Sequence, residues 1–253
     1  MIGLLLAAAI AATPVSFLSK NGTTSLTGSF YSAGPAKLPA VVVLHTCAGI
    51  DDAMTDWAQW LAQSGYDALV VDSFGPRHVE SVCGTHNVPP RERALDAYGA
   101  LAYLRSRADV DGDRIGVIGF SHGGGTVLWT ENADLAAKAG FASNGFRAAI
   151  AFYPNACDAK PAAALTFPLL VLIGALDNWT DAATCQQLLS RVDPGQTVGT
   201  IHVYPGAYHK FDDPQADRIA HIGAHQYTLR YDAAAAADAH DRVLAFLRSR
   251  LGP

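Results

Sequence analysis

The chain has 253 residues, of which 50% are hydrophobic and 16% are charged. This composition is typical of a globular domain with a sizeable core, and it excludes an intrinsically disordered chain. The formal net charge is −5, so the surface lacks the excess of Lys and Arg that neutralises nucleic-acid phosphates, and we expect no nucleic-acid partner.

The N-terminus begins with a run of small apolar residues. Residues 2–12 are typical of the hydrophobic part of a signal peptide, and residues 9–11 fit the small-x-small cleavage pattern, although no Lys or Arg precedes Lys20. A buried first strand is the alternative. The run is shorter than the roughly 20 apolar residues that span a bilayer, so we expect no stable membrane insertion. We therefore expect a signal peptide or apolar segment at residues 1–12 and one catalytic domain at residues 13–253. The location is then periplasmic or extracellular, or cytoplasmic if the segment is not a signal peptide.

From residue 40 onward, predicted strands and helices alternate. Continuous apolar runs predict buried strands, and apolar residues at helical spacing predict helices. The predicted strands are residues 40–45, 67–71, 114–118, 147–152, 168–173 and 200–204. The predicted helices are residues 56–63, 91–105, 180–191 and 232–250, with one more that begins at Ser121. Because parallel strands need crossovers, this order predicts an α/β fold with a mostly parallel central sheet, helices on both faces and ligands beyond the carboxyl ends of the strands.

Ser121 is the candidate nucleophile. It is the centre of a G-x-S-x-G motif that runs from Gly119 to Gly123, between a predicted strand and a predicted helix. A sharp turn between a strand and a helix crowds the backbone, so small residues are needed two positions before and two positions after the serine. The motif in this context predicts a nucleophilic serine.

A serine hydroxyl needs a base, and the base needs a carboxylate that fixes its tautomer. Asp177 follows the predicted strand at residues 168–173, and His209 follows the last predicted strand, which gives the expected order of serine, acid and histidine. The rival acid, Asp181, is explained as the start of a helix, and the rival histidine, His202, lies within a strand. We therefore predict that Asp177 and His209 complete a catalytic triad.

The negative oxygen that forms during attack needs hydrogen-bond donors. One predicted donor is the backbone N–H of His122, which directly follows the nucleophile. The other comes from the loop after the strand at residues 40–45, and we choose the backbone N–H of Cys47.

The chain resembles the dienelactone hydrolase family over roughly residues 36–250. The segments that carry the resemblance are residues 45–49, 72–77, 113–124, 174–177 and 209–211. It implies an α/β-hydrolase fold with no cap domain, and the short stretch at residues 153–167 leaves no room for a lid. It also implies an enzyme that acts on a small-molecule ester or lactone.

Four positions bear on the substrate that the resemblance implies. The enzymes that name the family have a cysteine nucleophile and a glutamate in the oxyanion loop, where this chain has Ser121 and Thr46. They also place an arginine four residues after the histidine to hold a substrate carboxylate, and here that position is Asp213. Arg77 is a loose match for their other carboxylate-binding arginine. We therefore expect a neutral short-chain ester or lactone.

Four cysteines are present, an even number with no C-x-x-C pair, so we expect no zinc site. In an oxidising compartment they could form two disulfides in any of three connectivities, with four buried thiols as the alternative. Resemblance to exported relatives implies the pairs Cys47 with Cys83 and Cys157 with Cys185.

Several other side chains are candidates for the pocket or for a metal. Tyr153, Trp179 and Phe211 flank the loops that carry the triad and are candidates to contact substrate, with core packing as the alternative. His221 and His225 would share one face of a helix, but no glutamate or third ligand accompanies them, so we expect no metal there.

The sequence therefore predicts a serine hydrolase that works through an acyl-enzyme on Ser121, and we expect no cofactor. One alternative is an inactive binding protein of the same fold. Another is an acyltransferase or a peptidase that uses the same three side chains. The sequence leaves the oligomeric state open.

Overall fold

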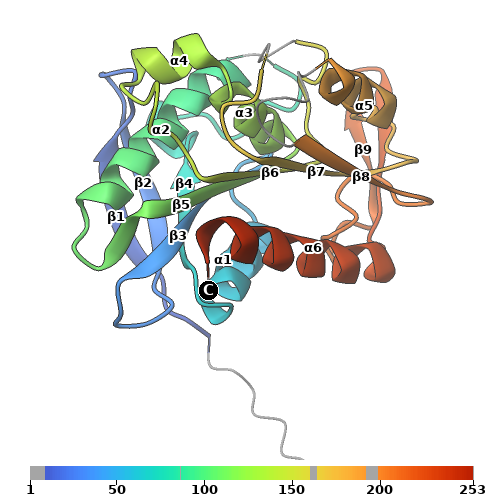
Figure 1. Ribbon diagram of the computed structural model, residues 1–253. Coiled ribbons are helices and arrows are strands. Elements are labelled where there is room, and N and C mark those ends of the chain that lie inside the picture. The colour runs from blue at the N-terminus through green and yellow to red at the C-terminus, as the bar shows by residue number, and fades with distance from the viewer. Residues whose placement is uncertain (1–8, 86, 160–163, 192–198, 253) are drawn as a thin grey trace, which may run out of the picture.

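The central sheet organises the molecule. A computed structural model of the chain describes residues 9–85, 87–159, 164–191 and 199–252. In this part of the chain, eight strands form one sheet in the order β1-β2-β4-β3-β5-β6-β7-β8 (Figure 1). The pairs β1–β2 and β2–β4 are antiparallel, and all pairs from β4 to β8 are parallel. The strands are β1 Thr13–Leu18, β2 Ser25–Tyr31, β3 Leu38–Leu44, β4 Asp67–Asp72, β5 Val110–Phe120, β6 Ala148–Phe152, β7 Leu169–Gly174 and β8 Gly199–Tyr204.

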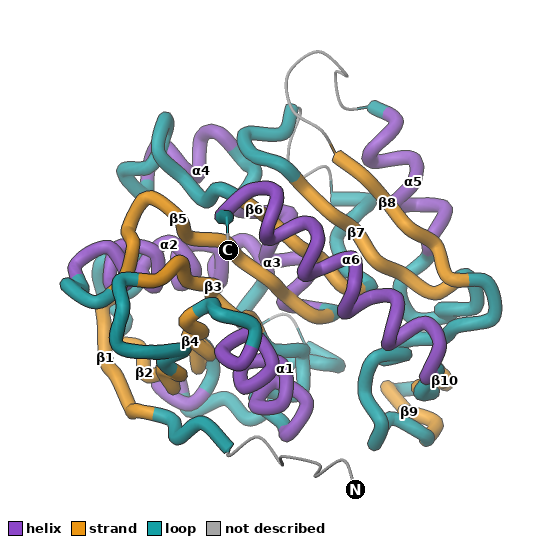
Figure 2. Tube along the Cα trace, turned by 60° about the horizontal axis from the view of Figure 1, so that its bottom comes forward, coloured by secondary structure: helices purple, strands orange, loops and turns teal. Residues whose placement is uncertain are grey.

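Helices cover both faces of this sheet, as the sequence predicts. Figure 1 shows α1 and α6 on one face and α2, α3, α4 and α5 on the other, and in Figure 2 α1 and α6 have turned toward the viewer. The helices are α1 Asp52–Gln63, α2 Pro90–Ser106, α3 His122–Thr130, α4 Ala133–Lys138, α5 Ala182–Ser190 and α6 Ala233–Leu251, with a short 3-10 turn at Gly75–Arg77. Asp232 caps α6 by accepting hydrogen bonds from two backbone N–H groups in the first turn.

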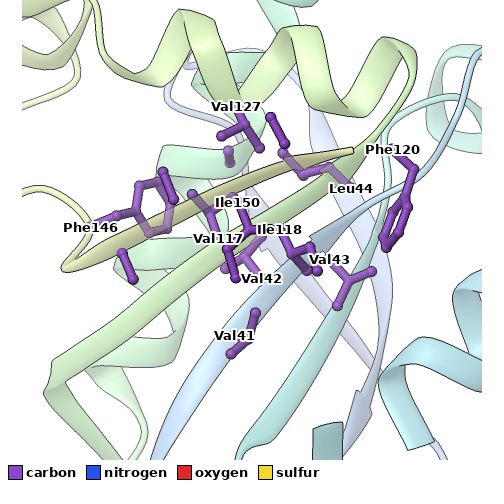
Figure 3. Packing of buried hydrophobic residues seen from close by; sticks show 14 of the residues in the cluster. Val41, Val42, Val43, Leu44, Val117, Ile118, Phe120, Val127, Phe146 and Ile150 are labelled. Atoms are coloured by element: carbon purple, nitrogen blue, oxygen red, sulfur yellow. The ribbon is translucent and has the colours of Figure 1, made fainter. Parts of the chain in front are cut away.

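The core lies along the two central parallel strands, β3 and β5. Every residue from Val41 to Leu44 is buried, as are Val117 and Ile118 opposite them (Figure 3). Helices cover both faces here, so neither face of these strands can tolerate polar side chains, which explains their continuous β-branched runs. This packing holds the carboxyl ends of β3 and β5 rigidly at one edge of the sheet.

The structure adds elements that the sequence pattern does not predict. The strands β1 and β2 form an antiparallel extension at the edge of the sheet, and α4 follows α3. Between β8 and α6 lies a separate two-stranded hairpin, β9 Arg218–Ile222 and β10 His225–Leu229. These strands are only partly buried, so their apolar residues do not form a recognisable run.

The predicted signal segment lies mostly outside the described residues. Of residues 1–12, only residues 9–12 are described, and they belong to no helix or strand. In the described part of the chain, no helix has both the length and the apolar character required to cross a membrane.

Candidate active site

Ser121 lies at the tight turn between β5 and α3. Its backbone has φ 54° and ψ −111°, a strained conformation for a residue with a side chain. A Cβ atom on Gly119 would lie 2.2 Å from the carbonyl oxygen of Gly123, and a Cβ on Gly123 would lie 2.2 Å from the carbonyl oxygen of Leu44. The two glycines of the motif are therefore required by the turn itself.

His209 faces Ser121 from the loop that follows β8. Its Nε2 atom lies 3.0 Å from Ser121 Oγ, and the imidazole is buried. The ring packs between Tyr153 and Trp179, with centroid distances of 4.5 Å and 5.1 Å. These two rings hold the imidazole within hydrogen-bonding distance of the hydroxyl.

Asp177 binds the other side of the imidazole. Its Oδ2 atom accepts a hydrogen bond from His209 Nδ1 at 2.7 Å. Its Oδ1 atom accepts from the backbone N–H groups of Trp179 and Thr180, each at 2.9 Å. Because the carboxylate can only accept, the proton of the neutral imidazole is on Nδ1, and Nε2 is an acceptor for the Ser121 hydroxyl.

Thr180 is part of this arrangement and was missed by the sequence analysis. Its hydroxyl lies 2.8 Å from Asp177 Oδ2 and 3.1 Å from the carbonyl oxygen of Tyr153. The available signal was its position three residues after Asp177, where a side chain and a backbone N–H can fold back onto the carboxylate.

The two rival residues lie elsewhere. Asp181 caps α5 by accepting hydrogen bonds from the backbone N–H groups of Ala183 and Thr184. His202 lies on β8, with its Nε2 atom 3.8 Å from Asp238. Neither contacts Ser121, so the structure brings together the three side chains that the sequence selected.

The two residues predicted to supply oxyanion donors lie beside Ser121. Cys47 and His122 line one cavity together with Ser121. In the loop after β3, His45 Nδ1 donates to the carbonyl oxygen of Thr46 at 2.8 Å, and its Nε2 accepts from a backbone N–H. The Thr46–Cys47 peptide is trans, so the Cys47 N–H points away from the imidazole of His45. Burial, and next the positive charge of Arg93, hold the pKa of His45 well below its usual value, which keeps this imidazole neutral.

A small apolar cavity of about 110 Å³ opens on Ser121 and His209. Residues of β9 and β10, which the sequence analysis did not place, form one of its walls. The lining residues are Thr46, Cys47, Ala48, Cys83, Ser121, Trp179, His209, Lys210, Arg218, Ala220, Ile222 and Leu229. A larger cavity of about 530 Å³ lies elsewhere, beside Phe141 and Phe167, and includes none of the triad residues. A cavity of about 190 Å³ also opens on Ser121, on the side of Cys47 and His122. The apolar cavity, which Ser121 and His209 both line, is the candidate acyl site.

Of the four residues predicted to contact substrate, only Trp179 lines this cavity. Tyr153 and Phe211 are completely buried beneath the site, and the Tyr153 hydroxyl donates to Asp212 at 2.7 Å. Their prediction as pocket residues is wrong, because side chains next to catalytic loops also fill the core under them. The prediction for Arg77 is wrong as well. Its guanidinium binds Asp96 with two hydrogen bonds of 2.9 Å and lines neither cavity at Ser121.

Asp213 lies four residues after His209, where the enzymes that name the family have an arginine. It takes part in an ion cluster with Lys210 and Asp51. Lys210 Nζ lies 2.8 Å from Asp213 Oδ2 and 2.9 Å from Asp51 Oδ2. Burial alone would lower the pKa of Lys210, but the two carboxylates raise it above its usual value. The lysine therefore stays charged, and its charge is balanced by its own partners.

Two disulfides lie near the site, one between two loops and one between a loop and α5. The structure contains the pairs Cys47–Cys83 and Cys157–Cys185, which are those that the resemblance implied. Such bonds are typical of an oxidising compartment. In the described part of the chain, no group of three or more His, Cys, Asp or Glu side chains is arranged to hold a metal ion.

The expectation that His221 and His225 share one face of a helix is wrong. They lie on β9 and β10, where His221 pairs with Gln226 and His225 pairs with Ile222 across the hairpin. A spacing of four residues can come from a tight hairpin as well as from a helix, and here it comes from the turn that includes Gly223.

Residues 27–251 match the dienelactone hydrolase family. The chain belongs to the dienelactone hydrolase family. The match covers the eight-stranded sheet except β1 and the first two residues of β2, and it supports an enzyme that hydrolyses carboxylic esters or lactones.

Several known proteins are similar to the chain over most of its length. A probable 2-oxo-3-(5-oxofuran-2-ylidene)propanoate lactonase from Bradyrhizobium is 28% identical, over 82% of this chain and 87% of the relative. The carboxymethylenebutenolidase of Pseudomonas putida is 25% identical, over 92% of this chain and 94% of the relative. Among solved structures, a dienelactone hydrolase-like promiscuous phosphotriesterase from metagenomic libraries has a TM-score of 0.73 at 23% identity, and covers 97% of this chain and 100% of its own. This last likeness shows the α/β-hydrolase fold.

Proposed function

We propose that the chain, as a single catalytic domain at residues 13–253, hydrolyses small carboxylic esters or lactones through an acyl-enzyme on Ser121. The observation that carries the proposal is the continuous chain of hydrogen bonds from Ser121 Oγ through His209 to Asp177, with heavy-atom distances of 3.0 Å and 2.7 Å. A general base at this distance can take the hydroxyl proton as the oxygen attacks a carbonyl carbon.

In this mechanism, Ser121 Oγ bonds to the substrate carbonyl carbon while its proton passes to His209 Nε2. Asp177 stabilises the positive imidazolium that results. The backbone N–H groups of Cys47 and His122 donate to the carbonyl oxygen as it becomes negative. His209 then gives the proton to the leaving alcohol oxygen, and a water molecule releases the acid from Ser121 by the same steps in reverse.

The size and charge of the site favour a neutral short acyl group. The cavity of about 110 Å³ has space for only a few carbon atoms, and apolar side chains of the hairpin and Trp179 form its walls. Arg77, the cation expected to bind a substrate carboxylate, is already paired with Asp96, and Lys210 is paired with two carboxylates. Arg218 also lines the cavity, so an acyl group that carries a carboxylate belongs among the substrates tested.

The two disulfides support function outside the reducing cytosol. We propose that residues 1–12 include a signal peptide and that the mature enzyme is periplasmic or extracellular. N-terminal sequencing of the protein secreted by the cell tests this directly, because an intact Met1 would contradict removal of the segment.

The first test of the activity uses a fluorophosphonate probe, which phosphonylates activated serines. Mass spectrometry of the wild-type protein should locate the label on Ser121, and Ser121→Ala should abolish it. Ser190→Ala is the matched control, because this serine is exposed at the end of α5 and should leave labelling unchanged.

The second test measures turnover of 4-nitrophenyl esters with acyl chains from acetyl to octanoyl, together with a hemisuccinate and a five-membered lactone. We expect the highest kcat/KM for the shortest neutral acyl groups, and a loss of at least about 10⁴-fold in Ser121→Ala. A protein that is not labelled at Ser121, or that is labelled but turns over no ester or lactone, would contradict the proposed function.

A further inference from the structure

Arg93 is a completely buried arginine directly behind the site. It lies in the first turn of α2, and none of its surface is accessible to solvent. One terminal nitrogen, Nη1, donates to His122 Nδ1 at 2.8 Å, and the other, Nη2, donates to the carbonyl oxygen of His45 at 3.0 Å. One guanidinium therefore joins the two separate segments that carry the proposed oxyanion donors.

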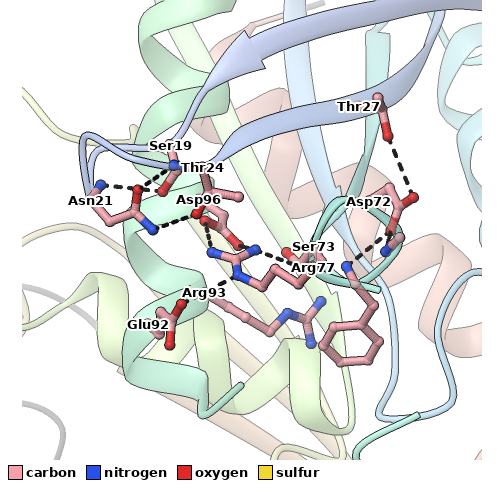
Figure 4. A network of polar contacts seen from close by, with 12 residues as sticks. Ser19, Asn21, Thr24, Thr27, Asp72, Ser73, Arg77, Glu92, Arg93 and Asp96 are labelled. Atoms are coloured by element: carbon pink, nitrogen blue, oxygen red, sulfur yellow. Dashed lines mark hydrogen bonds and ion pairs between the residues drawn. The ribbon is translucent and has the colours of Figure 1, made fainter. Parts of the chain in front are cut away.

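The charge of Arg93 is not explained by an ion pair. Among the described residues, no carboxylate lies within ion-pair distance of its guanidinium. Asp96, on the same helix, is bound by Arg77 instead (Figure 4). The guanidinium instead lies 5.0 Å from the ring centroid of Phe74, and its Nε atom has no hydrogen-bond partner in the described part of the chain. Burial lowers the pKa of Arg93 to about 9. A buried charge without a counter-ion destabilises a fold, so its contacts point to a functional role.

We infer that Arg93 is a positioning residue for the oxyanion hole and sets the direction of both backbone donors, an inference that rests on the function proposed for Ser121. The guanidinium is planar and rigid, so its two terminal nitrogens fix their two acceptors relative to each other. It also places a positive charge behind the position where negative charge develops, which favours the transition state over the bound ester.

On one side, the contact acts through the ring of His122. Arg93 can only donate, so His122 Nδ1 accepts and the ring is neutral. His122 is the first residue of α3, and its own N–H is the proposed donor. Holding the side chain therefore limits rotation of the peptide that bears this N–H.

On the other side, the contact acts through two consecutive peptides. Arg93 Nη2 fixes the carbonyl oxygen of His45, and the ring of His45 fixes the carbonyl oxygen of Thr46. In a trans peptide the N–H lies opposite the carbonyl, so the direction of the Cys47 N–H follows from the second of these contacts. Loss of Arg93 removes the donor that joins the two segments and frees the loop to turn.

The test compares Arg93→Met and Arg93→Lys with a matched control, Arg105→Met. Arg105 lies on the same helix, donates to the carbonyl oxygens of Gly112 and Asn144, and contacts an aromatic ring at 5.3 Å, but none of these residues lines a cavity at Ser121. Near-ultraviolet circular dichroism and thermal unfolding establish which variants are folded. Three quantities are then measured: the rate constant for phosphonylation of Ser121, kcat and KM for the best ester of the panel, and the affinity of a trifluoromethyl ketone with the same acyl group.

The ketone is informative because Ser121 adds to it and forms a stable oxyanion, so its affinity reports the donors and not the fold. In Arg93→Met we expect kcat, the labelling rate and the ketone affinity to fall together by about 10- to 100-fold, while KM stays within about twofold of wild type. This decrease is no larger than the one that removal of a single oxyanion donor causes. Arg93→Lys keeps the charge but cannot span both acceptors, so it should lie between wild type and Arg93→Met. Arg105→Met should stay within about twofold of wild type.

Each outcome decides between the two proposals. If Arg93→Met is folded and keeps its labelling rate and ketone affinity, the role of Arg93 is refuted while the function of Ser121 stands. A loss of kcat without a loss of ketone affinity, or an equal loss in Arg105→Met, refutes it too. If Arg93→Met does not fold, Arg93→Lys alone decides by the same criteria. A wild-type protein that is not labelled at Ser121 overturns both proposals.

Discussion

Asp177→Asn is the substitution whose effect can be followed atom by atom. Two backbone N–H groups, those of Trp179 and Thr180, point at the Oδ1 position. Only the amide oxygen of the asparagine can accept from them, so the amide nitrogen must occupy the Oδ2 position that faces His209. That nitrogen donates to His209 Nδ1, which must then carry no proton. The proton of the neutral imidazole moves to Nε2, and this nitrogen can no longer accept from Ser121.

The wrong tautomer should reduce kcat/KM by about 10⁴-fold, which corresponds to about 5.5 kcal/mol of barrier. The variant should nevertheless fold. The Thr180 hydroxyl accepts from the new amide nitrogen and donates to the carbonyl oxygen of Tyr153, which already lies 3.1 Å away. No buried polar group is left without a partner, so we expect thermal unfolding within a few degrees of wild type.

The assay is turnover of the best 4-nitrophenyl ester, with circular dichroism to establish folding. Asp181→Asn is the matched control, because this nearby carboxylate caps α5 and is exposed. We expect only a small decrease in its free energy of unfolding, and an activity within about twofold of the wild-type value. The reasoning is refuted if folded Asp177→Asn retains more than about a tenth of wild-type activity, or if the control loses as much.

Three further expectations concern stability and substrate choice. Burial raises the pKa of Glu131 to about 8. Between about pH 5 and 8, the folded state therefore holds a proton that the unfolded state has lost, and the free energy of unfolding falls as the pH rises. Glu131→Gln should remove that fall in urea titrations, and parallel pH profiles would contradict this. Replacing Cys47 and Cys83 by Ser opens a link across 36 residues and should lower the free energy of unfolding by about 4 kcal/mol and reduce kcat, whereas unchanged urea midpoints would disprove the first part. Ile222→Ala enlarges the cavity and should shift the preferred acyl chain by one or two carbons, changing the ratio of kcat/KM values about tenfold, and an unaltered chain-length profile would count against the assigned acyl site.

The central sheet and the triad could be predicted because each depends on local sequence. Buried parallel strands require continuous apolar runs, and β3, β5, β6 and β7 have them. Ser121 is identified by flanking glycines, because the turn has no room for a larger residue at either position. Asp177 and His209 lie in the loops after strands whose carboxyl ends lie at the same edge of the sheet. These are consequences of backbone geometry, which a single sequence records well.

The remaining features depend on distances between segments, which sequence spacing does not record. Arg93 is one of three arginines in α2, and only the fold brings it to His45 and His122. Tyr153, Phe211 and Trp179 are all aromatic residues close to the catalytic loops in the sequence. The rings of Tyr153 and Phe211 are buried in the core, whereas Trp179 lines the cavity. The partly exposed hairpin has neither a long apolar run nor a helical period, so no pattern marked it.

That hairpin has a consequence for how such an enzyme can change. Asn178 bonds to the backbone of Gln226 and Thr228, and the ring of Trp179 stacks on Tyr227 at 4.6 Å. The end of β10 also contacts the histidine loop through the backbone, because Leu229 forms a β-bridge with His209. The hairpin contributes Ala220 and Ile222 to the acyl site but none of the reacting groups. Selectivity thus resides mainly in a piece of chain that carries none of the reacting groups, so a grafted hairpin that keeps the backbone bridge to His209 would change which acids are released while the triad stays in place.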